Sequence, residues 1–292
     1  MFILSHNPGV GIIMTDNQNQ ELLDLPYSER QLVIVQPDEV VYSARRAGKN
    51  QKPAEESADL KDAAVRIGKM ALNYTMYGPF GLAAIEGINA WKKARESGLN
   101  VLQIGRTEAS LLRFPPGHPR DQTLYVAHPA QPSIYYTTAV FHRMVFEHKF
   151  AEAIRLLMSL GARTIKVEHV CGWSREFSSR MSVPLTEAGI TSSAEYSEKG
   201  GSSLLFEATF DNNNESAIPA DLVWFPHEPT WQTVAEGRIK YGLSKFSLIV
   251  NYEDDMGVNA GLKVRAQKAG LDLGGTFEDH ANTVWKINGE FL

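Results

Sequence analysis

The chain has 292 residues, and its 43% hydrophobic and 22% charged residues are typical of a globular protein. The net charge of −5 and the absence of any block of basic residues exclude duplex nucleic acid as a main partner. The single cysteine, Cys171, excludes an intrachain disulfide and favours a reducing, cytoplasmic location.

The N-terminal segment is not typical of a secretory signal. It is apolar but contains no Lys or Arg before Arg30, and a signal needs a positively charged start. Met14 is an alternative start of translation. We expect residues 1–31 to be an extension, residues 32–292 to form a single mixed α/β domain, and a sub-boundary to lie near 174–203.

The first elements are predicted from apolar spacing. Residues 32–44 indicate two short strands, QLVIV and EVVYSA, separated by a turn at Pro37-Asp38. Helices are expected over about 57–76 and 80–97. The apolar run from Met70 to Ile85 is shorter than the ~20 residues that cross a bilayer, and Gly78-Pro79 interrupts it. The chain is therefore not expected to be a transmembrane protein.

One pattern occurs three times along the chain. A predicted helix ends at a glycine and is followed directly by a run rich in β-formers, at helices 80–97, 137–160 and 230–241, which end at Gly98, Gly161 and Gly242. Such units on short connections predict helices packed on a sheet.

Further strands are expected at QTLYVAH, at SSLLFEATF and in the last forty residues. Alternation from Phe246 to Phe291 indicates a C-terminal antiparallel meander. Within it, strands over 258–266 are favoured over a helix at 258–269. The predicted fold is α+β, with helices packed on a mixed or mainly antiparallel sheet.

No strong catalytic or cofactor motif is present, so candidate residues come from the helix over 137–160. Arg143 and Glu147 fall within its apolar arc, whereas His148 and Glu152 lie on the opposite, polar side. Arg143 and Glu147 are four residues apart, so their side chains can meet. They form either a buried ion pair that fixes the helix on the sheet, which is favoured, or part of a ligand-binding cleft.

Histidines near this helix are the second group of candidates. If the Pro-rich loop before the helix folds over it, His128, His142 and Glu147 can act as acid and base. His142 and His148 point about 120° apart on a helical wheel, so no metal is expected, and no cofactor. On the strand over 163–170, His169 and Cys171 are expected to be core residues and not a catalytic pair.

These features favour an interaction or assembly protein, with a protein partner or self-association, that uses the apolar hairpin at 70–91 or the edge of the meander. The first alternative is a hydrolase or transferase with a site around Arg143, Glu147, His142 and His128. The second is a membrane-active effector in which residues 66–92 or 257–291 rearrange as an amphipathic hairpin.

Overall fold

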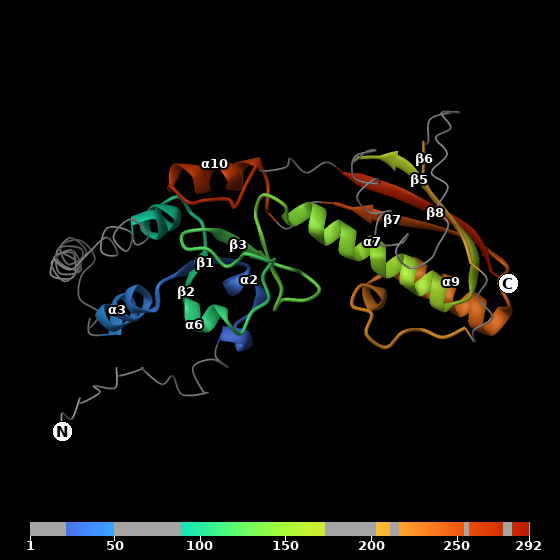
Figure 1. The fold of residues 1–292 in the computed structure, drawn as a ribbon, viewed down its shortest axis with the longest axis horizontal. Helices are drawn as coiled ribbons and strands as arrows, with labels where there is room; N and C mark the ends of the chain where they lie inside the picture. The colour runs from blue at the N-terminus through green and yellow to red at the C-terminus, as the bar shows by residue number, and fades with distance from the viewer. Residues whose placement is uncertain are drawn as a thin grey trace, which may run out of the picture. The chain divides into compact units, whose positions relative to one another are not determined.

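A computed structural model describes residues 22–49, 89–172, 203–210, 216–253, 257–276 and 282–291. The chain divides into two compact units, Met1–Ala127 with Pro132–Tyr135, and His128–Gln131 with Tyr136–Leu292. Helices accompany two four-stranded sheets, one mixed and one antiparallel, which confirms the predicted α+β class (Figure 1). That residues 32–292 fold as a single domain stays a prediction. A single cooperative unfolding transition of the whole chain would support it.

The sheet of the first unit contains a parallel pair. Its order is β2-β1-β3-β4, made of β1 (Leu32–Gln36), β2 (Val101–Gly105), β3 (Leu124–Ala127) and β4 (Tyr135–Thr137). β1 runs parallel to β2 and antiparallel to β3. A parallel neighbour requires a crossover, and the chain leaves β1 through α3 (Asp38–Lys49) before it returns at β2.

The predicted strand EVVYSA is wrong, because these residues belong to α3. Pro37 starts the helix, since the backbone N–H groups of Val40 and Val41 both donate to its carbonyl oxygen. Asp38 and Glu39 in the first turn also favour a helix through its dipole. The β-branched residues Val40 and Val41 suggested a strand, but they are buried as part of the helix.

β1 and β3 are buried along their whole length, and one hydrophobic cluster of the first unit lies on one face of their sheet. Val33, Val35 and Ile104 contribute from the strands, and Tyr125 and Tyr135 contribute large rings. The short helices α2 (Tyr27–Arg30) and α6 (Arg106–Ala109) accompany these strands. The hydroxyl of Tyr27 donates to the carbonyl oxygen of Ala127 at 3.0 Å, which fixes α2 to the end of β3.

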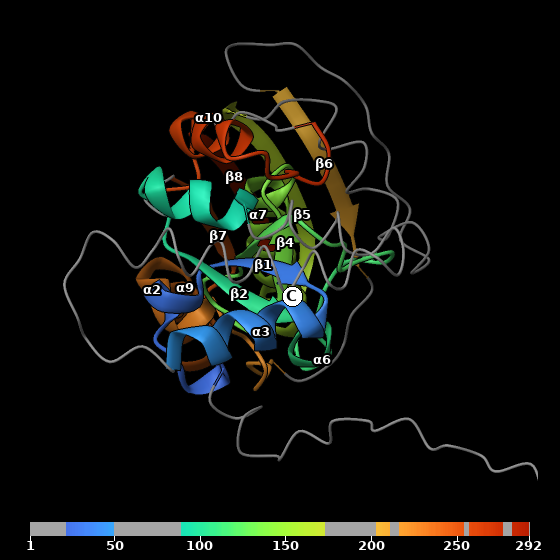
Figure 2. The same ribbon diagram turned by 90° about the vertical axis from the view of Figure 1, so that its left-hand side faces the viewer.

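The second unit contains an antiparallel sheet of order β6-β5-β8-β7. Its strands are β5 (Ala162–Cys171), β6 (Ser203–Thr209), β7 (Lys245–Tyr252) and β8 (Thr283–Phe291). β6 lies at one border of the sheet, as both ribbon views show, and β7 lies at the other (Figures 1 and 2). β7 alternates exposed and buried residues, so one face of this sheet is packed and the other is in solvent.

The three helix–glycine–strand units are confirmed. A helical segment containing residues 89–96 precedes β2, α7 (Phe141–Ser159) precedes β5, and α9 (Pro229–Tyr241) precedes β7. Their glycines, Gly98, Gly161 and Gly242, have φ angles of 79°, 84° and 65°. This left-handed conformation reverses the chain at the helix end, where any other residue would be strained.

The C-terminal strands are confirmed at β7 and β8, but the strands expected over 258–266 are wrong. These residues form α10 (Ala260–Lys268), where the Asn259 side chain caps the helix by accepting from the Leu262 backbone N–H at 3.2 Å. Val258, Leu262 and Ala266 are buried at helical spacing. That spacing supports the alternative helix, which the apparent alternation had concealed.

Three expectations lie outside the described residues: the helix over 57–76, most of the apolar hairpin at 70–91 and nearly all of the sub-boundary near 174–203. Among the described helices, none is both long enough and apolar enough to span a bilayer.

Candidate functional site

His142, at the start of α7, is a buried and fully engaged histidine. Its Nδ1 lies 2.8 Å from the Tyr252 hydroxyl, and its Nε2 contacts the Val258 carbonyl oxygen. The side chain is only 3% exposed. The two ring nitrogens thus connect α7 to β7 and to the segment that leads into α10. These contacts indicate that His142 holds these elements together.

Arg143 and Glu147 lie on α7 at the predicted spacing, and both are half-buried. They are therefore on the border between the packed and exposed sides of the helix. That they contact each other stays a prediction.

His128 lies in a different environment from His142. Its Nδ1 accepts from the backbone N–H groups of Ala130 and Gln131 at 3.1 and 3.0 Å. The neutral ring therefore carries its proton on Nε2, which has no hydrogen-bond partner among the described residues. The ring packs edge-on against His148, with centroids 4.8 Å apart. The structure thus brings His128 to His148 on α7, whereas His142 has its partners in Tyr252 and Val258.

Burial controls the ionisation of this histidine pair. Burial, with a smaller contribution from the neighbouring His148, lowers the pKa of His128 from 6.5 to about 3. Burial also lowers the pKa of His148, against the opposing effect of Glu152. Protonation of His128 at Nδ1 would break both hydrogen bonds from the loop, so the folded loop requires the neutral ring.

We expect this pair to make the fold sensitive to acid. Because the pKa of His128 is lower in the folded state, its stabilisation is complete above pH 6.5 and declines as pH falls towards 3. The slope reaches about 1.4 kcal/mol per pH unit. The measurement is urea unfolding at pH 7.5 and 5.0. His128→Asn, whose carbonyl oxygen can accept the same N–H groups, should remove about 2 kcal/mol of the pH dependence. The control is His227→Asn at an exposed site, and an unchanged slope in His128→Asn would contradict the assignment.

Glu152 is a buried carboxylate that the sequence analysis did not identify as a candidate. It was expected on the solvent side of the helix, but it is 5% exposed. Its carboxylate accepts three consecutive backbone N–H groups, from Val223, Trp224 and Phe225, at 2.7 to 2.9 Å. All three donors precede or begin the short 3-10 helix η1 (Phe225–His227). Glu152 therefore holds the segment before α9 onto α7.

Lys149 completes this buried cluster. Its Nζ forms an ion pair with Glu228 at 2.5 Å and donates to the carbonyl oxygen of Asn251 at 3.0 Å. The same ammonium lies 5.4 Å from the ring centroid of Trp224, at cation–π distance. The indole N–H of Trp224 in turn donates to His148 Nδ1 at 2.9 Å. The cluster is a satisfied network that joins α7, η1 and β7, which is the arrangement of a structural anchor.

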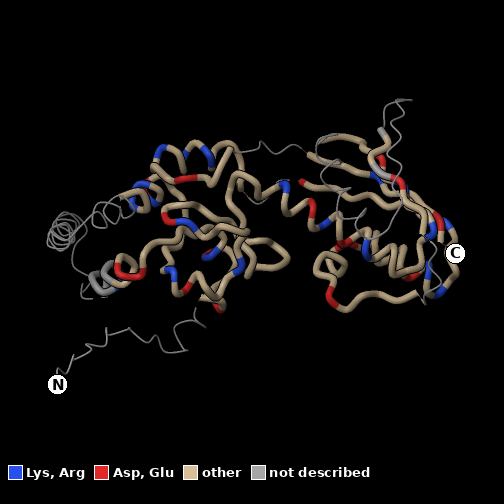
Figure 3. Tube along the Cα trace, viewed as in Figure 1, with Lys and Arg blue, Asp and Glu red and all other residues tan. Residues whose placement is uncertain are grey.

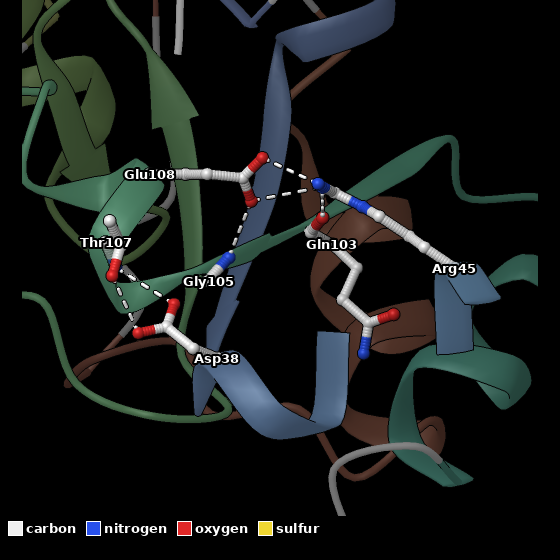
Figure 4. Close-up of polar contacts among 6 residues, drawn as sticks. All are labelled: Asp38, Arg45, Gln103, Gly105, Thr107 and Glu108. Carbon is white, nitrogen blue, oxygen red and sulfur yellow. Dashed lines mark hydrogen bonds and ion pairs between the residues drawn. The ribbon is translucent and has the colours of Figure 1, made fainter. Parts of the chain in front are cut away.

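In the first unit, polar side chains gather where β1 and β2 end. The Asp38 carboxylate accepts from the backbone N–H and the hydroxyl of Thr107 at 3.0 and 2.8 Å (Figure 4). It lies directly over Gly105, where an added Cβ would be 2.2 Å from Asp38 Oδ1. Glycine at this position therefore permits the carboxylate to reach Thr107.

A second carboxylate closes the same group. Glu108 accepts from both terminal nitrogens of Arg45, at 2.7 and 3.1 Å, and from the Gly105 backbone N–H at 2.9 Å (Figure 4). Arg45 also donates to the carbonyl oxygen of Gln103 at 3.0 Å. Each carboxylate oxygen thus has a partner within the protein, and the group fixes α3 to β2 and α6.

We expect Gly105→Ala and Asp38→Ala to each lower the free energy of unfolding by about 1–2 kcal/mol, because each displaces the carboxylate from Thr107. The double variant should cost hardly more than either single one, since the clash exists only when Asp38 is present. Urea midpoints for the four proteins measure this coupling. Additive costs would contradict the contact.

The free border of β7 is the remaining candidate. The Phe291 backbone N–H donates to Ser244, so alternate residues from Phe246 to Tyr252 face β8. The peptide groups of the residues between them point away from the sheet. These exposed residues form what we call the β7 edge: Lys245, Ser247, Ile249 and Asn251. Among them, Asn251 alone has a described partner for its outward carbonyl oxygen, which accepts from Lys149.

The side chains beside the β7 edge are charged but balanced. Lys245 pairs with Glu290 of the neighbouring strand β8 at 2.7 Å. At the opposite border of the sheet, Lys166 of β5 pairs with Glu207 of β6 at 2.7 Å. Basic and acidic residues are interspersed along these strands (Figure 3). Ile249 is the apolar exception within the β7 edge, with 53% of its surface exposed.

Among the described residues, no group of three His, Cys, Asp or Glu side chains is placed to hold a metal ion. Cys171, expected in the core, is exposed at the end of β5, where the strand register shifts. No protein-family model, curated protein or solved structure matches the chain.

Proposed function

We propose that this chain is a cytoplasmic interaction or assembly protein that accepts an extended segment at the β7 edge. The observation that carries the proposal is the row of outward peptide groups over the eight residues of β7, which contains no irregularity in its pairing with β8. A regular edge that no described strand joins is a template for another strand, whose main chain supplies hydrogen bonds.

The β7 edge has few of the features that prevent pairing with another strand. Proteins prevent unwanted pairing with lysines, bulges or short edge strands. The β7 edge has one lysine, at its beginning, and the exposed Ile249 near its middle. β6, at the opposite border, faces a strand whose register shifts between Val167 and Glu168. Specific recognition therefore favours β7 over β6.

The enzyme alternative, around Arg143, Glu147, His142 and His128, has weaker support. His142 has both nitrogens engaged, and His128 is fully enclosed and held by its own loop. The membrane alternative rests on residues 66–92 and 257–291. Within the second range, α10 buries Leu262 and Ala266, which favours packing within the protein.

The test is site-specific photo-crosslinking in the cells that make the protein. A photoreactive amino acid replaces Ile249 in the full chain, and a matched control carries it at Val170, which is 48% exposed on the inner strand β5. We expect a specific crosslinked species from position 249 that is absent from position 170. Mass spectrometry then identifies the species as another protein or as a second copy of this chain. Equal or no crosslinking at the two positions would contradict the proposed function.

A further inference from the structure

We propose that the partner at the β7 edge is a second copy of this chain, paired antiparallel about a two-fold axis that passes through Ile249. This inference rests on the proposed function and adds the identity of the occupant. A two-fold interface uses the same patch on both copies, so the patch must be complementary to itself. The sequence of the β7 edge meets this condition in one register.

In that register, Ile249 lies opposite Ile249 of the second copy. The pair covers the most exposed apolar side chain of the sheet. On either side, Ser247 lies opposite Asn251 of the second copy, and neither residue introduces a charge. Each of these residues presents its peptide group outward, so the Ile249 pair can exchange two hydrogen bonds. The Asn251 carbonyl oxygen already accepts from Lys149, and its second lone pair can accept from the Ser247 N–H of the second copy.

The ends of the paired strands provide the charge complementarity. Glu253 follows β7 by one residue and is exposed. With Ile249 on the axis, Lys245 of each copy lies opposite Glu253 of the other. Lys245 already pairs with Glu290 at 2.7 Å within its own chain. The dimer therefore has a carboxylate, an ammonium and a carboxylate in one row at both ends.

The two nearest registers on the Lys245 side lack this complementarity. Pairing Ser247 with itself places Lys245 opposite Ile249, and pairing Ser247 with Ile249 places Lys245 opposite Asn251. In neither case does Lys245 meet an acidic residue across the interface. Opposite charges directly across a strand pair stabilise it and like charges destabilise it, so the register on Ile249 is favoured.

The experiment is sedimentation equilibrium of the purified full chain over a wide concentration range. We expect a reversible dimer. Ile249→Lys places two ammonium groups together on the axis and should abolish dimerisation, whereas the matched control Val170→Lys should leave it unchanged. Circular dichroism verifies that both variants are folded.

Charge reversal tests the register itself. Lys245→Glu alone places two glutamates across the interface at both ends, and Glu253→Lys alone places two lysines there. Each variant should dimerise about tenfold more weakly than the wild type. A mixture of the two variants restores an opposite pair at both ends of the heterodimer. The mixture should therefore associate with close to wild-type affinity.

A chain that remains monomeric at every accessible concentration would overturn this inference. So would a dimer that is insensitive to Ile249→Lys, or variants whose mixture fails to recover affinity. The proposed function has a separate criterion. If position 249 crosslinks to another protein while the purified chain is monomeric, the β7 edge is an interaction site with a different occupant. If position 249 crosslinks to nothing specific and the chain is also monomeric, both proposals are wrong.

Discussion

Replacing Glu152 with alanine is expected to lower the free energy of unfolding by about 4 kcal/mol. The carboxylate is 5% exposed and accepts three backbone N–H groups from Val223, Trp224 and Phe225. Alanine leaves these three donors without their acceptor in a partly buried site. Glutamine keeps one acceptor oxygen and should cost about half as much.

Urea unfolding, followed by circular dichroism, measures both Glu152 variants. Glu236→Ala is the control, because Glu236 is exposed on α9 and pairs with Lys240 four residues away. That change should cost about 0.5 kcal/mol or less. A Glu152→Ala variant as stable as the control would show that the segment before α9 is not held by this carboxylate.

Replacing Trp285 with alanine should be equally damaging, at about 4 kcal/mol. The indole is 1% exposed on β8 and packs edge-on against Phe146 and Phe150 of α7, with centroids 5.0 and 4.9 Å apart. Alanine would remove the contact between the helix and the sheet and leave a cavity. Trp285→Phe keeps a ring and should cost about 1–2 kcal/mol.

The control for Trp285 lies on the same sheet. Val170→Ala shortens an exposed side chain of β5 and should change the free energy of unfolding by about 0.5 kcal/mol or less. Intrinsic fluorescence and circular dichroism during urea unfolding measure the three variants. A sub-kcal effect of Trp285→Ala would mean that α7 does not pack on β8 through this residue.

The sequence predicted the fold best where backbone constraints are local. A glycine that ends a helix before an apolar run predicted β2, β5 and β7, because the left-handed turn needs no long-range information. The errors occurred where two periodicities compete. Val40 and Val41 suit a strand, but Pro37 and the acidic residues after it start a helix. The helix α10 was concealed in the same way by a run of alternating apolar residues.

The candidate site was harder to predict because its partners are distant in sequence. Glu152 lies on the polar side of α7, and its buried state depends on a segment some seventy residues later that covers it. His128 lies near α7 in sequence, but its neutral state depends on two backbone N–H groups of its own loop. The edge of the meander was predicted as a contact surface, but the sequence did not indicate which strand forms that edge. β7 lies at the border because β8 pairs with β7 on one side and with β5 on the other.

Residue-resolved hydrogen exchange along β7, at low and high protein concentration, tests the central claim most directly. In dilute protein, the outward amides of Ser247 and Ile249 should exchange rapidly, whereas those of Leu248 and Val250, which face β8, should be protected. At high concentration, Ser247 and Ile249 should become protected as the second copy adds its strand. Protection of these two amides at every dilution, or rapid exchange at every concentration, would contradict a free β7 edge that pairs with a second copy.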